Sequence, residues 1–185
     1  MAKVIRKKPS ILGKLDFSFG NIFFVSAFFA GILLTIFAIN ISRLTFVTWR
    51  IPTLIWLLTG VFITPCFFKT LPKYLERDGF FYQLTYNILT WGGIVAYLFL
   101  ALNFYFAAGE TTKQEVKVVG YGKLAKGRNG CGEPYVDIKL LELEKQLFFP
   151  CGTDVSRYSA ISLVLQPGLF GFYVIKDKKP SVGDN

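Results

Sequence analysis

Two cysteines are the residues with the most defined chemistry in this 185-residue chain. Cys131 and Cys151 both lie in its less apolar C-terminal part. In an oxidising compartment such a pair forms a disulfide, and closing a loop of about 20 residues stabilises a small domain by roughly 3 kcal/mol on the chain-entropy estimate. We therefore predict a Cys131–Cys151 bridge, with two unrelated free thiols as the alternative. Cys66 falls inside an apolar run and is interpreted as a small apolar residue.

A basic, glycine-rich loop leads up to the first of these cysteines. The segment 123–132, KLAKGRNGCG, contains Lys123, Lys126 and Arg128. Backbone amides and basic side chains in such a loop can hold an anion or a lipid headgroup. The segment matches neither GxxxxGK(S/T) nor GxGxxG, so a nucleotide site is not predicted. The alternative is a plain connection between two strands that the disulfide holds in place.

Residues for acid–base or metal chemistry are missing or scattered. The chain has no histidine, which excludes Ser-His and Cys-His catalysis and every histidine-ligated metal site. The carboxylates of the C-terminal part fall on predicted turns and on a predicted solvent-facing strand face. We therefore expect no catalytic residue, no metal site and no cofactor, and the chain is not predicted to be an enzyme. The carboxylates considered are Glu133, Asp137, Glu142, Glu144 and Asp154.

The elements that position these residues begin with three long runs that contain no charged side chain. A bilayer core about 30 Å thick needs roughly 20 residues of helix. We therefore predict three transmembrane helices, at about 21–41, 51–68 and 88–107, within a membrane region that covers 21–109. The first run is far longer than the roughly 7–15 apolar residues of a secretory signal, so a retained helix is expected.

The second and third predicted helices carry features that can bend or shorten them. Pro52 fits the first turn of a helix, whereas Pro65 is expected to kink or end it. A re-entrant or interfacial segment is the alternative for this second run. In the third run, the aromatic and amide residues of 80–87 predict an interfacial approach to the span, and Gly92-Gly93 predicts close packing or a bend.

The distribution of basic residues predicts how the chain crosses the membrane. Cytoplasmic loops carry an excess of Lys and Arg. The arm 1–20 and the loop after the second helix are rich in both, whereas the loop between the first two helices has only Arg43 and Arg50. This places the N-terminus in the cytoplasm and, after three spans, the C-terminal domain outside a bacterial inner membrane. With only two true spans, that domain would return to the cytoplasm.

The C-terminal domain, residues 110–177, is predicted to be all β. Alternating residues predict about five short antiparallel strands, with turns at Glu144-Lys145 and Pro167-Gly168. A small barrel or sandwich is expected, and a five-stranded OB-like barrel is one candidate. The polar tail 178–185 is predicted to be disordered. The predicted strands are 114–121, 135–143, 146–149, 160–166 and 169–175.

Charge placement narrows the function classes. The formal net charge is +9, but most of the excess lies beside the apolar runs. Lipid headgroups therefore explain it better than nucleic acid. The leading hypothesis is an accessory or interaction subunit that presents the β domain to a partner protein, a lipid or an envelope polymer, alone or as a homo-oligomer. The alternative is a subunit of an oligomeric transport or channel assembly, and a membrane enzyme acting on lipid is the third hypothesis.

For the transport alternative, small residues would bring helices of different copies together. Gly31, Gly60, Gly92 and Gly93 are the residues expected at such contacts. The predicted spans contain no charged residue in their interiors, however, although transporters that move ions or protons place ionisable groups there. This absence argues against a transporter that works alone.

Overall fold

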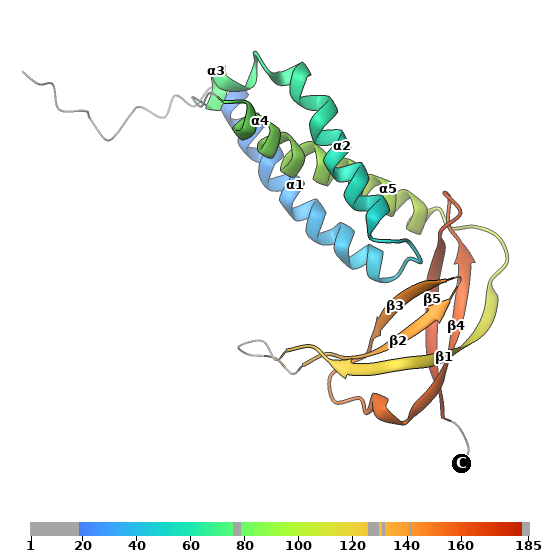
Figure 1. The fold of residues 1–185 in the computed structure, drawn as a ribbon. Helices are drawn as coiled ribbons and strands as arrows, with labels where there is room; N and C mark the ends of the chain where they lie inside the picture. Colours follow the sequence, from blue (N-terminus) through green and yellow to red (C-terminus); the bar gives the residue numbers. More distant parts are fainter. Residues whose placement is uncertain (1–18, 76–78, 126–129, 131, 141, 183–185) are drawn as a thin grey trace, which may run out of the picture.

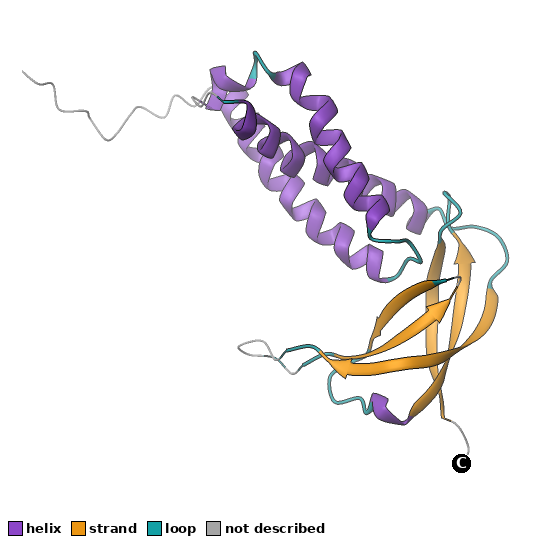
Figure 2. Cartoon of the chain, in the orientation of Figure 1, coloured by secondary structure: helices purple, strands orange, loops and turns teal. Residues whose placement is uncertain are grey.

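Three long apolar helices precede a curled five-stranded antiparallel sheet (Figures 1 and 2). The computed structural model describes residues 19–75, 79–125, 130, 132–140 and 142–182. The helices lie side by side, and the sheet sits against one end of them, where the connection between the first two helices also lies (Figure 1). Most of the predicted arm, residues 1–18, lies outside the described residues.

The helices match the predicted spans, with one difference at the third. The first two are α1 (Phe19–Arg43) and α2 (Arg50–Phe67), followed by the short α3 (Leu71–Leu75). The third runs without interruption over α4 (Phe80–Asn87), the π-helical turn Ile88–Gly92 and α5 (Gly93–Tyr105). All three are long and apolar enough to cross a membrane.

The third helix starts at Phe80, earlier than the predicted 88. Gln83 and Asn87 are buried, although the sequence suggested an interfacial approach to the span. Asn87 donates a hydrogen bond from Nδ2 to Thr64 Oγ1 of α2 at 3.2 Å. A polar side chain with a partner on the neighbouring helix can lie within the bundle and so does not end the helix.

Glycines bring the helices into close contact at the π-helical turn. A Cβ at Gly93 would lie 2.4 Å from the carbonyl oxygen of Gly31 on α1, and one at Gly92 would lie 2.4 Å from that of Trp56 on α2. Only glycine permits backbones to approach this closely. The close-packing role predicted for Gly92-Gly93 is confirmed, and these contacts join helices of one chain.

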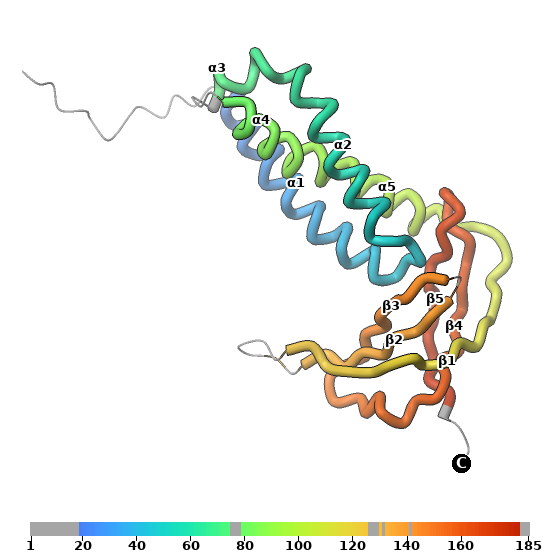
Figure 3. The backbone as a smooth tube through the Cα atoms, viewed as in Figure 1, coloured from blue at the N-terminus to red at the C-terminus, as the bar shows by residue number. Residues whose placement is uncertain are grey.

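The five strands form one antiparallel sheet in the order β3-β2-β1-β4-β5. Figure 3 shows the sheet bending into a half-barrel. Buried apolar residues from all five strands form its core cluster. A short 3₁₀ turn, Val155–Arg157, links β3 to β4. With β1 in the middle, β3 and β5 are the two edges of the sheet. The strands are β1 (Thr112–Lys123), β2 (Pro134–Leu140), β3 (Leu143–Phe148), β4 (Tyr158–Pro167) and β5 (Tyr173–Val182).

Two predicted boundaries in the sheet are wrong. Leu140 pairs with Leu143, so β3 begins at Leu143, and Glu144 and Lys145 belong to β3 rather than to a turn. The fifth strand begins at Tyr173 and extends to Val182. Residues 178–182 are therefore strand and not disordered tail, because β4 provides backbone partners along the whole length of β5. Residues 183–185 lie outside the described part of the chain.

Candidate functional site

The connection between α1 and α2 is an integral part of the β domain. Thr45 forms an antiparallel bridge with Val174 on the edge strand β5. The Phe46 N–H donates to the Tyr173 carbonyl at 2.7 Å, and the Ile175 N–H donates to the Leu44 carbonyl at 2.8 Å. The Phe46 side chain, 3% exposed, belongs to the core cluster of the half-barrel. A loop between two apolar helices thus adds a β-bridge and a core residue to the sheet.

The opposite edge strand holds the same connection through a lysine. Lys145 of β3 donates from Nζ to the carbonyls of Ser42 at 2.7 Å and Thr45 at 2.5 Å. Its ammonium lies 5.6 Å from the centre of the Phe46 ring. The last carbonyls of an α-helix have no partner within the helix, so a cation at the end of α1 is well placed. Burial lowers the pKa of Lys145 to about 8.

A third link joins the end of α5 to the turn between β4 and β5. Asn103, fully buried, donates from Nδ2 to the Phe172 carbonyl and accepts from the Phe170 N–H at Oδ1, each at 3.0 Å. The Phe99 ring stacks on Phe170 with 4.9 Å between centroids. A primary amide satisfies both backbone groups of the turn at once, so the turn is fixed on the helix.

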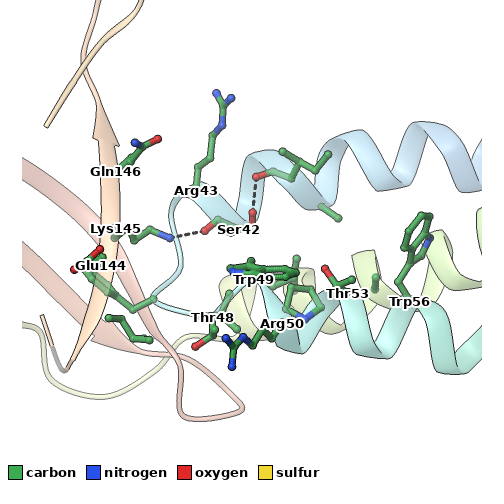
Figure 4. A pocket seen from close by; sticks show the side chains of 18 of the residues that line it. Ser42, Arg43, Thr48, Trp49, Arg50, Thr53, Trp56, Glu144, Lys145 and Gln146 are labelled. Carbon is green, nitrogen blue, oxygen red and sulfur yellow. Dashed lines mark hydrogen bonds between the residues drawn. The ribbon is translucent and has the colours of Figure 1, made fainter. Parts of the chain in front are cut away.

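A cavity of about 830 Å³ lies at this junction (Figure 4). Its walls come from the end of α1, the start of α2, α5, and the β2–β3 turn with β3. The lining residues that lie further along the helices are mostly apolar. Those at the helix ends and on the sheet include five charged side chains, Arg43, Arg50, Glu142, Glu144 and Lys145.

The cations of the cavity differ in how they are held. Figure 4 shows Lys145 reaching from β3 to Ser42 at the end of α1, whereas Arg43 and Arg50 extend away from it in different directions. The Arg43 guanidinium lies 3.8 Å from the Glu133 carboxylate and 4.6 Å from the centre of the Phe148 ring. Arg50 has no ion-pair partner among the residues that the structure describes. Its charge is therefore available to a ligand.

Of the residues predicted for the disulfide and the anion-binding loop, the two that the structure describes, Cys151 and Lys123, do not line this cavity. Cys131, Lys126 and Arg128 fall outside the described residues. Cys151 is exposed in the turn after β3, and Lys123 is exposed at the end of β1. The disulfide and the anion-binding loop therefore stay predictions.

Sequence reasoning missed Phe46, Asn103 and Lys145 as residues that join the two halves. The segment Thr45-Phe46-Val47-Thr48 is rich in β-branched and aromatic residues, which is a strand signal between two helices. That signal could have placed the connection in the sheet. No comparable local signal exists for Asn103, whose two partners are contributed by a distant turn.

Comparisons of the chain with protein-family models, with curated proteins and with solved structures found no match. Its function is therefore inferred from its own residues and geometry.

Proposed function

We propose that the chain is an accessory or interaction subunit of a cytoplasmic membrane. In this proposal the N-terminus is cytoplasmic, and the β domain is held at the outer surface and presented to a partner protein. The observation that carries it is the insertion of Phe46 and Thr45, from the α1–α2 connection, into the half-barrel. A domain that shares its core and a strand bridge with its anchor keeps a set orientation at the membrane, which favours docking to a partner.

The surface best suited to that partner lies on the β1–β2 hairpin. Val119 and Tyr121 of β1 are 68% and 60% exposed, and Leu124 follows them with its side chain also exposed. A bulge after Val118 shifts the register of β1 against β2 at this point. Such bulges re-aim side chains, and exposed apolar clusters mark interaction sites. We define Val119, Tyr121 and Leu124 as the hairpin patch.

Site-specific photo-cross-linking in intact cells tests this proposal. A cross-linker at Tyr121 is expected to capture one defined protein, and Val119→Asp is expected to abolish that product by placing a charge in the contact. A cross-linker at Lys179, exposed on β5, is the matched control and should not give the product. Identical products from both positions, or a product that survives Val119→Asp, would contradict the proposal.

The transport or channel assembly is the second hypothesis. Buried polar residues inside the helices, Gln83 and Asn87 of α4 and Thr64 of α2, are the observation in its favour. Gly31, Gly92 and Gly93 offer it less support than the sequence suggested, because they make contacts within one chain. Solute flux through proteoliposomes that contain only this protein would favour this hypothesis over the accessory role.

A further inference from the structure

The cavity at the junction continues into the helical bundle as an apolar space. Ala38 and Ile39 of α1, Pro52 of α2, and Ala96 and Leu100 of α5 line this part of it. Both α1 and α2 pack against the third helix, which contributes the α5 residues of this lining. A space with these walls suits a hydrocarbon chain, because burial of apolar surface against apolar side chains is favourable.

The cavity lies at the level where the apolar helices end. Trp49, which lines it at the start of α2, is 71% exposed. Tryptophan is enriched at the boundary between hydrocarbon and headgroups. Further along α2, Leu54 and Leu57 expose apolar surface, as expected for a face in contact with lipid. A ligand in the cavity would therefore have its polar end among headgroups and its apolar end among acyl chains.

The charged end of the cavity is lined by both positively and negatively charged side chains. Arg50 has no ion-pair partner among the described residues. Lys145 uses its ammonium for two backbone carbonyls, and an ammonium has a third donor. Both can bind phosphate oxygens. Glu142 and Glu144 line the same end. A lone phosphate would meet these carboxylates unfavourably, whereas a headgroup with both a phosphate and an ammonium complements all four side chains.

We propose that the cavity binds one aminophospholipid from the adjacent membrane leaflet. The phosphate lies at Arg50 and Lys145, the ammonium lies at Glu142 and Glu144, and one acyl chain enters between α1 and α2. The cavity volume of about 830 Å³ falls in the range of roughly 300–1,000 Å³ that holds small ligands. The proposal requires that the helices span a membrane but not that a protein partner exists, so it can fail independently of the proposed function.

Native mass spectrometry of the full chain in detergent micelles tests the headgroup site. The probes are phosphatidylethanolamine and phosphatidylglycerol with identical acyl chains, each titrated separately. We expect one phosphatidylethanolamine to be retained more tightly than phosphatidylglycerol. Arg50→Gln should weaken that binding about tenfold, because a charge-assisted contact is lost. The matched control is Lys69→Gln, which removes an exposed cation beside the other end of α2 and should leave the binding unchanged.

Two further variants separate the acyl part of the site from the headgroup part. Ile39→Trp places a large side chain in the cavity from a position on α1 that is already half exposed, and it should prevent retention of the lipid. Ile36→Trp, at a similarly exposed position on α1 outside the cavity lining, is its control. Glu144→Gln should reduce the preference for phosphatidylethanolamine over phosphatidylglycerol, because the carboxylate that meets the ammonium is lost.

The proposal is overturned if Arg50→Gln and Lys69→Gln bind equally well, or if the phosphatidylglycerol complex is as strong as the phosphatidylethanolamine complex. Retention of inorganic phosphate in the absence of lipid, with the same dependence on Arg50, would also overturn it, since the acyl chain would then contribute nothing. All of the substituted side chains in the headgroup comparison are exposed or line the cavity, so elution of folded protein on size exclusion is expected for both variants.

Discussion

At the scale of single residues, three side chains from distant parts of the chain join the helices to the sheet. Lys145 holds the end of α1, Asn103 holds the β4–β5 turn, and Phe46 fills the core of the half-barrel. Asparagine and lysine at these places were visible in the sequence, but neither residue type indicates by itself which backbone groups it will contact. Because Glu144-Lys145 is a plausible turn in the sequence, Lys145 was predicted to lie in a turn rather than at the helix end.

The half-buried ammonium of Lys145 makes the free energy of unfolding depend on pH. Its pKa falls from 10.5 in the unfolded chain to about 8 in the fold because burial disfavours the charged form. Between these values the unfolded chain binds more protons, so this residue makes the fold more stable as the pH rises through that window. Below about pH 8 both states are protonated, and the full cost of burying the charge remains.

We expect the free energy of unfolding of the native chain, relative to Lys145→Met, to increase by at most about 2 kcal/mol between pH 8 and 9.5. The two carbonyl hydrogen bonds favour the charged form, which makes this figure an upper limit. Thermal unfolding in detergent across this pH range measures it. Lys139→Met, at an exposed lysine on β2, is the control. A difference that stays flat with pH would contradict the burial of this charge.

At the scale of elements, the α1–α2 connection forms a β-bridge with the sheet although it lies between two helices. It pairs with β5 through Thr45 and Val174, and β3 contacts it from the other side. The two edge strands of a half-barrel, here β3 and β5, present unpaired N–H and C=O groups that can pair with another chain. Here part of the β5 edge is covered by the chain itself, which reduces the surface open to unwanted strand pairing.

Because the Phe46 side chain belongs to the core of the β domain, we expect the stability of that domain to depend on it. Phe46→Ala is expected to destabilise the β domain by about 3–5 kcal/mol, as for other buried phenylalanines, because it leaves a cavity in the core. The resulting loss of structure should appear as faster proteolysis within residues 112–182 and as a lower Tm. Phe62→Ala, at a position on α2 that is 73% exposed, is the matched control. Equal protease resistance of the two variants would show that the connection does not support the sheet.

At the scale of the whole molecule, the helices and the sheet form a continuous structure with a defined end-to-end arrangement. The α1–α2 connection and the sheet lie at one end, and the α2–α3 connection lies at the other (Figure 1). Three antiparallel helices therefore place the β domain on the side opposite α3. Which side of a cell membrane that is, and whether Cys131 and Cys151 are joined there, remain predictions from charge and residue type.

A membrane-impermeant maleimide applied to intact cells tests both predictions at once. In a Cys66→Ala background, which removes the free exposed thiol, we expect no labelling until a reductant is added and two labels afterwards. Labelling without reductant would refute the bridge. Labelling that requires permeabilised cells would place the β domain in the cytoplasm and support the two-span alternative.

The sequence by itself determined the three apolar helices and the β character of the C-terminal part. Both follow from local patterns, because long uncharged runs and period-two alternation are properties of neighbouring residues. Only the tertiary structure decided that the third helix begins at Phe80, that β5 continues to Val182, and that Phe46 belongs to the sheet. In each case the partner that decides the structure is far away in the chain. Asn87 of the third helix bonds Thr64 of α2, the end of β5 pairs with β4, and the α1–α2 connection pairs with β5. The cavity has the same origin, since its walls come from segments that no local pattern brings together.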